Sequence, residues 1–372
     1  MPRSMKVALL SPGLVVQGTE AHSIPCLSWL IEHLRAAGHE VHVFVPGQEA
    51  ESGSGAGLWP WQLRMLRSLV EAHREKRFDI VHAFWSSFGF VGAVAAGILG
   101  VPLVVTLPGG DMASLPDIGY GGRNSLKGRL HLRAATFAAR AIIVPSNFMR
   151  GMAARLGIQA AVVPFGVSLD HWPASPPRRR DPSQPLRLLH VASLNRVKDQ
   201  PTLLRAMSIL KERGVRFGLR IIGFDTLNGE IQRLARDLQL DGVVQFAGAV
   251  PHRELRSEYE QADLLVITSR HDAGPMVMME AAACGVPTVG TCVGHIADQA
   301  PAAAIAVPIG DAPALADAIS TLGHDEVRRL AIAAAAQAFA LENDARHSVH
   351  ILETIYRGVR ARRGQSANKV GG

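Results

Sequence analysis

The chain has 372 residues, of which 48% are hydrophobic and 19% are charged, a composition that excludes a fibrous or largely disordered protein. That length is too great for one hydrophobic core, so two domains are expected. A formal net charge of +7 favours anionic partners such as nucleotides, phosphates or acidic lipids. Nucleic-acid binding is not indicated, because no long basic run alternates with aromatic residues.

Cysteine usage and hydropathy bear on the compartment. Cys26, Cys284 and Cys292 lie in apolar segments and form no CxxC pair, which indicates reduced core thiols. No charged-then-apolar leader precedes the first strand-like segment, and no apolar stretch approaches the roughly 20 residues that span a bilayer. A cytoplasmic location is therefore expected, with peripheral membrane contact as the further possibility.

The first half of the chain alternates short β-rich segments with helical patterns, which is typical of βα units and parallel sheets. A helix expected over residues 20–37 ends at Gly38, a residue suited to the position after a helix. Several strand segments are apolar throughout, as strands covered on both faces must be. The expected strands are Lys6–Leu10, Val41–Val45, Ile80–Ala83, Leu103–Thr106, Ala141–Val144 and Ala161–Val163.

A proline-rich, charged segment interrupts this pattern. Residues Trp172 to Pro185 read WPASPPRRRDPSQP and show no periodicity, so we interpret them as a linker. The βα pattern then restarts, and alanine-rich helices follow from Glu326. The expected strands of this half are Leu186–Ala192, Leu219–Gly223, Val243–Phe246, Leu264–Thr268, Thr288–Thr291 and Ile305–Val307.

The sequence thus predicts an α/β protein with two doubly wound, Rossmann-like domains that face a central cleft. The predicted parts are an N-terminal domain over 1–171, a linker over 172–185, a C-terminal domain over 186–340, a helix over 341–362 that returns toward the N-terminal domain, and a flexible tail over 363–372.

Two cations follow the first strand of the second domain. Arg196 and Lys198 lie in the loop before a helix, for which Asp199 is a plausible N-cap and Pro201 suits the first turn. Open parallel sheets bind ligands at the carboxyl ends of their strands. Backbone N–H groups, the helix dipole and two cations converge at this loop, which indicates an anion site. The alternative is a solvated loop with incidental charges.

A second loop carries acidic residues. Asp272 follows the strand 264–268, and Pro275 begins a helix whose N-terminus offers amides, while Gly274 permits a close approach to a ligand. Glu280 lies in an otherwise apolar helix, so its carboxylate needs partners. A ribose diol would suit it, because an ionised carboxylate accepts from two hydroxyls. A structural salt bridge is the alternative.

These two loops resemble the retaining glycosyltransferases of family four, which have the GT-B fold. That family carries an Arg and a Lys after the first strand of its second domain, as Arg196 and Lys198 stand here. It also carries E-x7-E followed by small residues and Gly-x-Pro, which the segment from Asp272 to Pro287 matches. Similar but less specific segments are 38–41 and 162–167.

The resemblance implies transfer of a sugar from a UDP- or GDP-type donor to an unidentified acceptor, lipid-linked or a glycan, with retention of configuration. Arg196 and Lys198 would bind the donor diphosphate and stabilise the leaving charge. Asp272 would contact the donor sugar and Glu280 the ribose. Neither a metal nor a cofactor beyond the donor is expected. Further donor contacts are implied at Gly18, Gly223, Val250, Gly274, Pro275, Met276 and Val277.

Several other reaction classes lack their motifs. There is no D-x-D to hold a divalent metal on a diphosphate, so side-chain cations would have to neutralise it. No GxGxxG follows a strand and no GxxxxGK[ST] occurs, which argues against an NAD enzyme or a P-loop NTPase. A hydrolase elbow of the form GxSxG is also missing from the sequence.

Two positions depart from the family pattern. Asp272 stands where the family has Glu, which withdraws the carboxylate by about one C–C bond, ~1.5 Å. Many members have a His in T-x-H-G, whereas this chain has Pro108 there, and Asp111 is the candidate to take over contacts with the sugar or acceptor. A nucleotide-sugar epimerase of the same fold and a non-catalytic nucleotide-sugar-binding relative therefore stay open as alternatives.

Two segments of the first domain mix basic and apolar residues, as helices that touch membranes do. They are Trp59–Arg67 and the region with Arg123, Lys127, Arg129, His131 and Arg133. The favoured alternative is that Leu63, Leu66 and Leu69 pack on the sheet. His22 and His295 lie near presumed ligand loops, where we expect surface or cleft-lining roles without chemistry.

Overall fold

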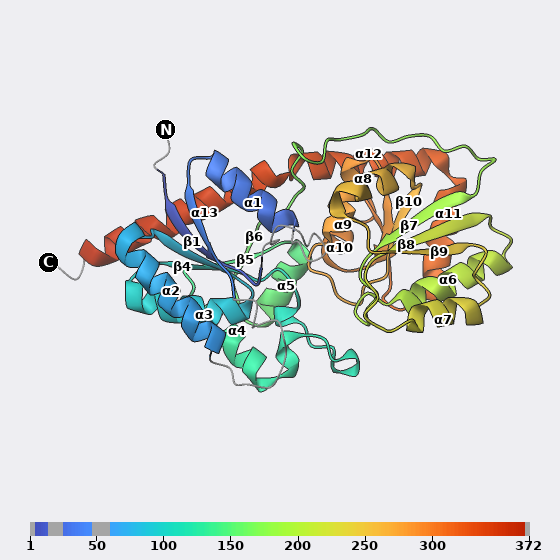
Figure 1. The fold of residues 1–372 in the computed structure, drawn as a ribbon. Coiled ribbons are helices and arrows are strands. Elements are labelled where there is room, and N and C mark those ends of the chain that lie inside the picture. The colour runs from blue at the N-terminus through green and yellow to red at the C-terminus, as the bar shows by residue number, and fades with distance from the viewer. Residues whose placement is uncertain (1–3, 14–24, 47–59, 369–372) are drawn as a thin grey trace. The chain divides into compact units, whose positions relative to one another are not determined.

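A computed structural model describes residues 4–13, 25–46 and 60–368. Side chains are described for these ranges except Pro60 and 362–368. The chain divides into two compact units. Unit 1 comprises Met1–Pro164 and Ala345–Gly372, and unit 2 comprises Phe165–Asp344. Each unit contains a parallel sheet with helices on both faces (Figure 1), which confirms the predicted fold class.

The sheet of unit 1 has six parallel strands in the order β2-β1-β3-β4-β5-β6. The order reverses between β1 and β3, and ligands of such sheets bind at the carboxyl ends of the strands beside the reversal. Every strand lies within one residue of its expected bounds. The strands are β1 (Lys6–Leu10), β2 (Glu40–Phe44), β3 (Ile80–Phe84), β4 (Leu103–Thr106), β5 (Ala141–Val144) and β6 (Ala161–Val162).

Helices cover both faces of this sheet (Figure 1). One face carries α1 (Pro25–Ala36) and α13 (Ala345–Asn368), and the other carries α2 (Pro60–Lys76), α3 (Ser86–Leu99) and α4 (Leu126–Ala138). Helix α5 (Asn147–Arg155) lies beside β5 and β6. Three short 3-10 helices between β4 and α4 are η3 (Gly110–Met112), η4 (Pro116–Ile118) and η5 (Gly122–Asn124).

Helix α13 is fixed to unit 1 by buried polar contacts. His82 Nδ1 lies 2.6 Å from the Tyr356 hydroxyl, and His39 Nε2 lies 2.8 Å from the Glu353 carboxylate. The helix expected over 341–362 therefore belongs to the first unit. It continues to Asn368, so 363–368 are helical rather than a flexible tail, and 369–372 lie outside the described residues.

The sheet of unit 2 also has six parallel strands, in the order β12-β11-β10-β7-β8-β9. Its order reverses between β7 and β10, which makes their carboxyl ends the predicted ligand position. Each strand lies within two residues of its expected bounds. The strands are β7 (Leu186–Val191), β8 (Phe217–Ile222), β9 (Val244–Gly248), β10 (Leu264–Ile267), β11 (Thr288–Thr291) and β12 (Ile305–Val307).

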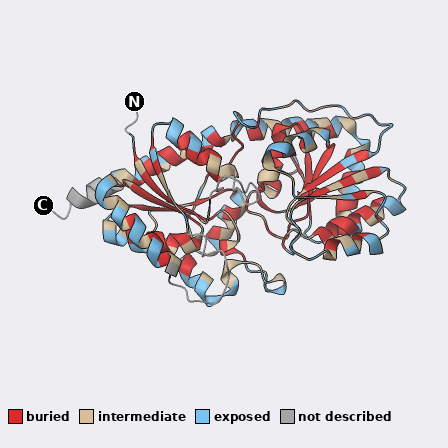
Figure 2. Cartoon of the chain, viewed as in Figure 1, coloured by how far each residue is buried: buried red, intermediate tan, exposed pale blue. Residues whose placement is uncertain are grey.

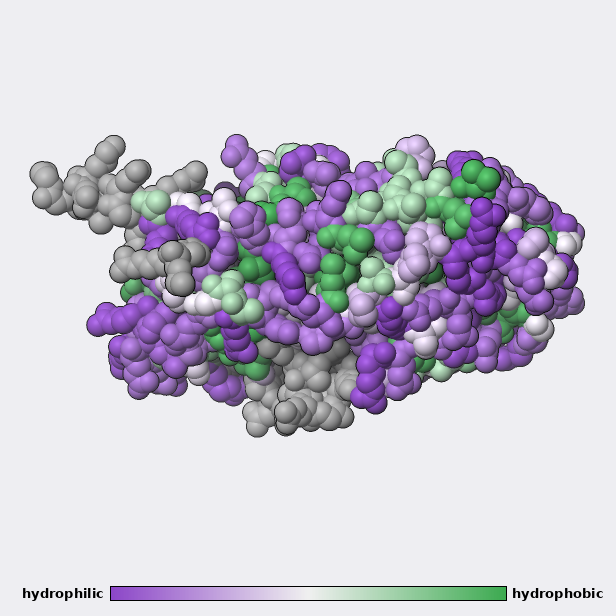
Figure 3. Space-filling model, turned by 90° about the horizontal axis from the view of Figure 1, so that it is seen from above, coloured by the Kyte–Doolittle hydropathy of each residue, from purple (hydrophilic) through white to green (hydrophobic). Residues whose placement is uncertain are grey.

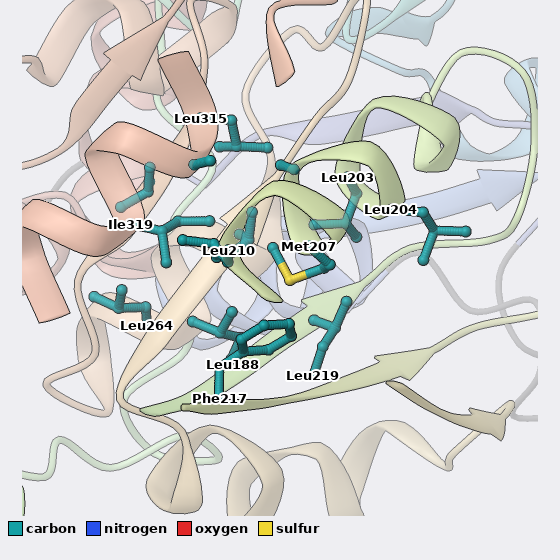
Figure 4. Close-up of a cluster of buried hydrophobic side chains, with 14 of the residues drawn as sticks. Leu188, Leu203, Leu204, Met207, Leu210, Phe217, Leu219, Leu264, Leu315 and Ile319 are labelled. Carbon is teal, nitrogen blue, oxygen red and sulfur yellow. The ribbon is translucent and has the colours of Figure 1, made fainter. Parts of the chain in front are cut away.

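The core of unit 2 lies between its sheet and one helix layer. Figure 2 shows the strands as the most buried elements, and Figure 4 shows Leu188, Met207 and Leu210 packed together. The layer over this core contains α6 (Gln200–Glu212), α7 (Glu230–Asp237) and α11 (Ala312–His324), and the opposite layer contains α8 (His252–Gln261), α9 (Met276–Ala283) and α12 (Glu326–Glu342), with α10 (Gly294–Gln299) after β11.

The segment interpreted as a linker is part of unit 2. Arg178 donates from Nη2 to Asp263 Oδ1 at 2.8 Å, and Arg329 Nη2 donates to the Arg178 carbonyl at 2.7 Å. Ser175 N donates to the Ala283 carbonyl at 2.9 Å. These anchors correct the linker interpretation, because the chain crosses between the units after Pro164 instead.

Truncation of Leu210 tests the packing of this core. Its side chain is fully buried on α6, so Leu210→Ala should lower the free energy of unfolding by about 2–5 kcal/mol through lost burial and a residual cavity. Urea denaturation measures the change. The exposed Val327 is the control, since Val327→Ala should change it by less than about 0.5 kcal/mol. Equal effects of the two substitutions would contradict the assigned core.

Candidate functional site

Two loops meet at the carboxyl ends of β7 and β10, where the strand order of unit 2 reverses. Thr268 Oγ1 donates to the Lys198 carbonyl at 2.8 Å, and Arg270 N donates to the Val197 carbonyl at 2.7 Å. One side-chain donor and one backbone donor of the loop after β10 thereby bind backbone carbonyls of the loop after β7. The two candidate loops of the sequence are thus brought together at one edge of the sheet.

An ion pair connects the side chains of the same loops. Lys198 Nζ lies 2.7 Å from Asp272 Oδ2, and the two side chains are 28% and 13% exposed. A charge-assisted hydrogen bond of this length in a partly buried place is stronger than a surface pair. The pair therefore holds one cation and one carboxylate in fixed positions at the predicted ligand edge.

The residues after Lys198 fix the start of α6. Asp199 has a left-handed backbone with φ 49° and accepts from Thr202 N, so the predicted N-cap is confirmed. The buried Gln200 amide Nε2 donates to the Ser193 carbonyl at 3.1 Å. The Asp199 cap and the Gln200 hydrogen bond together fix the backbone position from which the Lys198 side chain extends.

The end of β8 approaches the same loop closely. Gly223 has φ 153°, and a Cβ atom there would lie 2.0 Å from the Ala192 carbonyl oxygen. Only glycine fits this position. Val250, the other expected contact on this side, is half-buried just beyond β9. No ligand contact follows from these placements, and both residues stay predictions as donor contacts.

Arg196 does not join the Lys198–Asp272 pair. Its guanidinium lies 3.3 Å from Glu230 Oε2 of α7, and both side chains are exposed. An exposed pair of this kind contributes little free energy, so Arg196 can exchange partners at small cost. The sequence could not foresee Glu230, which lies 34 positions away on another helix.

Glu280 is buried in α9 with a partner on each carboxylate oxygen. His252 Nε2 lies 2.8 Å from Oε1, and the Tyr259 hydroxyl donates to Oε2 at 2.8 Å. Trp172 stacks on the His252 ring with centroids 4.9 Å apart. Burial raises the pKa of Tyr259 far above its usual value, so the phenol stays a donor. Both carboxylate oxygens thus have protein partners, and the expected ribose contact of Glu280 stays a prediction.

The backbone positions expected to contact a donor lie at the start of α9. Pro275 is buried at the N-cap, and Gly274, Met276 and Val277 are half-buried. The first amides of an eight-residue helix lie here, without a side-chain cap within the described residues. The structure leaves their expected role as donor contacts a prediction. Gly18 and His22 lie outside the described residues.

His295 is buried beneath the Asp272 loop rather than exposed. Gly294, which precedes it, approaches so closely that a Cβ atom would lie 3.0 Å from the Asp272 carbonyl oxygen. Burial lowers the pKa of His295 to about 4, although the nearby Asp272 opposes the shift. The expected surface or cleft-lining role is corrected, because this neutral imidazole supports the loop from below.

Asp111 lies in unit 1, at the start of the loop after β4. Its carboxylate accepts from Ser86 N at 2.7 Å through Oδ1. Within the described residues, Oδ2 has no hydrogen-bond partner. Burial raises the pKa of Asp111, while the Ser86 bonds oppose the rise. Burial of the Asp111 carboxylate with one unpaired oxygen therefore lowers the stability of the fold.

No group of three or more His, Cys, Asp or Glu side chains within the described ranges is placed to hold a metal ion. No described helix is long and apolar enough to cross a membrane.

Two family models match this chain. Residues 174–339 match the model described as Glycosyl transferases group 1, and residues 29–171 match Glycosyltransferase Family 4. The chain is 33% identical over 178 residues to a putative colanic acid biosynthesis glycosyltransferase of Escherichia coli, covering 45% of this chain and 43% of that protein. It is 28% identical over 237 residues to a D-inositol 3-phosphate glycosyltransferase of Pseudarthrobacter chlorophenolicus, covering 59% and 56%. The matches thus span about half the length of these relatives.

Solved structures share the fold. Sucrose-phosphate synthase from Thermosynechococcus elongatus superposes with a TM-score of 0.78 at 20% identity, covering 96% of this chain and 99% of that one. Anabaena HepE in complex with UDP-glucose superposes with a TM-score of 0.71 at 21% identity, covering 94% and 99%.

The buried His295 predicts an acid-dependent loss of stability. The unfolded side chain binds a proton near pH 6.5, whereas burial holds the folded pKa at about 4. The unfolded state therefore binds more protons between these values, and stability falls as pH falls from 7 toward 4. Between pH 7 and pH 5, wild type should lose on the order of 2 kcal/mol more than His295→Gln.

Urea denaturation at both pH values measures this difference. His324→Gln is the matched control, because that histidine is exposed and should keep the wild-type pH dependence. Identical pH dependence in wild type and His295→Gln would show that His295 does not titrate as its burial requires.

Proposed function

The chain belongs to the glycosyltransferases of family four, and on that premise we propose that it transfers a sugar from a nucleotide-diphosphate-sugar to an acceptor, without a metal ion and with retention of configuration. The observation that carries the proposal is the Lys198–Asp272 pair at the strand-order reversal of unit 2. A cation fixed at that edge suits a diphosphate, which is the anionic part of such a donor.

Lys198 would neutralise the charge that develops as the nucleoside diphosphate leaves. Asp272 holds the ammonium in place at the edge where the donor would bind. On binding, a phosphate oxygen would become a second acceptor for Lys198. Asp272 would then be available to a hydroxyl of the donor sugar.

Arg196 would supply the second cation of the diphosphate site. Its pairing with Glu230 is exposed, and the free energy of such a pair is small compared with a bond to phosphate in a closed site. Arg196 would therefore leave Glu230 on donor binding. Lys198 needs no comparable change of partner, so it should carry the larger share of the rate enhancement.

Glu280 would bind the ribose through lone pairs that His252 and Tyr259 leave open. Each carboxylate oxygen accepts one hydrogen bond in the free protein, and an oxygen of this kind can accept two. His252 is the more exposed of the two partners, so a ribose hydroxyl would reach Oε1 from its side. The backbone from Gly274 to Val277 and the residues Gly223 and Val250 would complete the donor contacts.

The comparisons support a UDP-type donor, since Anabaena HepE was solved with UDP-glucose. They support two acceptor classes, because one relative is named for colanic acid biosynthesis and another for D-inositol 3-phosphate. An epimerase or a non-catalytic binder of the same fold is the second candidate, motivated by Pro108 and Asp272. Product analysis with donor alone separates them: an epimerase converts the donor sugar, and a binder leaves it unchanged.

Removal of the Lys198 ammonium tests the diphosphate assignment. Lys198→Ala should lower the rate of donor turnover about 10²–10³-fold, because the leaving charge loses its principal donor. The release of UDP from UDP-glucose measures turnover, and circular dichroism checks the fold. Lys211→Ala is the control, since that lysine lies at the far end of the same helix and bonds the Gln239 carbonyl.

A Lys198→Ala enzyme with wild-type turnover would remove Lys198 from the site. A loss of the same size in Lys211→Ala would point to damage to α6 rather than to the donor site.

Membrane contact would be made by α4 rather than α2. On α2 Leu69 is buried and Leu66 half-buried, but Leu63 is 44% exposed and does not pack on the sheet as expected. On α4, Leu126, Leu130 and Phe137 are 66%, 57% and 91% exposed. The opposite side of unit 1, that of α1 and α13, appears in Figure 3 and is mostly hydrophilic.

Basic side chains flank the apolar residues of α4. Lys127, Arg129 and Arg133 are all exposed on this helix. Apolar side chains that enter the interface and cations that meet anionic headgroups are the features of an interfacial helix. The proposed partner of this surface is therefore an anionic lipid bilayer.

Vesicle flotation tests this contact. Wild type should float with phosphatidylglycerol vesicles at low salt, and Leu130→Glu combined with Phe137→Glu should reduce the bound fraction about tenfold or more, because it removes apolar area and adds repulsion. Val327→Glu, an exposed apolar position in unit 2, is the control. Failure of wild type to float with the vesicles at low salt would contradict the proposed membrane contact of α4.

A further inference from the structure

Unit 2 contains a cavity at the edge of its sheet opposite to the proposed donor site. It has a volume of about 300 Å³ and lies at the amino ends of β7 and β8, beside the last turn of α11. Strand β7 has six residues and is therefore about 20 Å long. Lys198, which follows the carboxyl end of this strand, does not line the cavity.

Two guanidinium groups line this cavity, and no carboxylate of the described residues does. Arg180 comes from the segment before β7, and Arg216 comes from the turn before β8. Glu326 accepts from Arg180 N at 3.0 Å, but its carboxylate is paired with Arg329 at 2.8 Å. Neither lining guanidinium forms an ion pair with a carboxylate within the described part of the chain. The cavity therefore has a positive lining.

Backbone carbonyls orient both guanidinium groups and leave some of their N–H groups unused. Arg180 donates from Nη1 to the Gly323 carbonyl at 3.1 Å and from Nη2 to the Gln184 carbonyl at 3.0 Å. Its buried Nε has no partner within the described residues. Arg216 donates from Nη2 to the Ser183 carbonyl at 2.9 Å, and neither its Nε nor its Nη1 bonds a described residue. Both groups thus keep donors for a further acceptor.

These cations are more than caps for the neighbouring backbone. The bond from Arg180 to Gly323 offsets the partial negative charge that the C-terminus of α11 presents to the cavity. A buried N–H group without an acceptor, such as Arg180 Nε, destabilises the fold. An anion in the cavity would supply acceptors where the protein supplies none.

The arrangement of the donors suits a phosphate group. They come from separate segments of unit 2, because Arg180 and the Gln184 amide precede β7, Arg216 precedes β8 and the Ser320 hydroxyl belongs to α11. The oxygens of a phosphate point in several directions and can accept from donors that surround it, whereas the two oxygens of a carboxylate lie in one plane. Guanidinium groups also bind phosphate in a bidentate manner.

The rest of the lining leaves space for the body of a small phosphate ester. Pro182, Leu186 and Val215 form apolar walls beside the arginines. The volume of about 300 Å³ is at the lower end of the range for small-molecule pockets. A charged end with apolar walls beside it is typical of such sites.

We propose that this cavity binds the phosphate group of a small molecule, either inorganic phosphate or a phosphate monoester, through Arg180 and Arg216. The site is independent of the proposed function, because none of its residues belongs to the donor loops. A bound phosphate joins the segment before β7 to the turn before β8, and it stabilises unit 2 by binding only its folded state.

The substitution Arg216→Gln tests the site. Arg216 is exposed, so its replacement removes a charge at small cost to the fold, which circular dichroism checks. Arg213→Gln is the matched control, because Arg213 is an exposed arginine near the same turn that pairs with Asp317 and does not line the cavity. Lys198→Ala is the second control, since it removes a cation of the proposed donor site instead.

Phosphorus NMR titrations at constant ionic strength measure the binding of inorganic phosphate and phenyl phosphate. Both probes should bind wild type, Arg213→Gln and Lys198→Ala alike. Arg216→Gln should bind them about 10- to 100-fold more weakly, the loss of hydrogen bonds between charged groups. Tighter binding of phenyl phosphate would identify a monoester as the ligand, and equal binding of the two probes would identify free phosphate.

Three results of these titrations would overturn the site. The first is that neither probe binds wild type, or that both bind Arg216→Gln as they bind wild type. The second is an equal loss in Arg213→Gln, which would mean attraction to a generally positive surface. The third is loss of binding in Lys198→Ala, which would place the phosphate at the proposed donor site.

Thermal unfolding gives a second readout. Phosphate at about ten times its Kd should raise the Tm of wild type by roughly 3–6 °C over the same ionic strength of sodium chloride, and that of Arg216→Gln by about 1 °C or less. An equal rise in the two proteins would show a general effect of the salt and would contradict the proposed site.

Discussion

The ion pair between Lys198 and Asp272 at the carboxyl edge of the sheet of unit 2 is the interaction on which the proposed donor site depends. It forms because parallel strands bring their carboxyl ends to one edge, and because the strand order reverses between β7 and β10 and leaves room there. Two hydrogen bonds between the loops, one from the Thr268 hydroxyl and one from Arg270 N, fix the spacing of the pair. A cation is thereby held at the edge where open parallel sheets bind their ligands.

Three buried polar side chains lie in or beside the sites described above. His295 is kept neutral beneath the Asp272 loop, Glu280 is satisfied by two donors from α8, and Asp111 keeps one oxygen open. These three cases differ in what burial accomplishes. Glu280 is paired on both oxygens, and the neutral form of His295 avoids the cost of a buried charge. The third leaves one carboxylate oxygen without a hydrogen-bond partner among the described residues, which costs the fold some stability.

The sequence predicted the strands well, since apolar runs and turn residues are local signals. It also predicted the Asp199 cap, which depends on neighbours within three positions. It placed the Lys198 and Asp272 loops at one sheet edge, but it did not identify several side-chain partners that are distant along the chain. Arg196 pairs with Glu230 on α7, Glu280 bonds His252 and Tyr259 on α8, and the presumed linker is fixed to unit 2. Periodicity carries no information on which side chains the fold brings together. Pro251, which precedes His252, is a local signal that a helix begins there.

The most direct test of the central claim is a calorimetric titration of UDP into the protein in EDTA at two salt concentrations. If Lys198 neutralises the diphosphate without a metal ion, UDP should bind in EDTA, uridine should bind much more weakly, and added salt should weaken UDP but not uridine. Equal affinities for UDP and uridine in EDTA, or UDP binding only when a divalent metal is restored, would contradict the account.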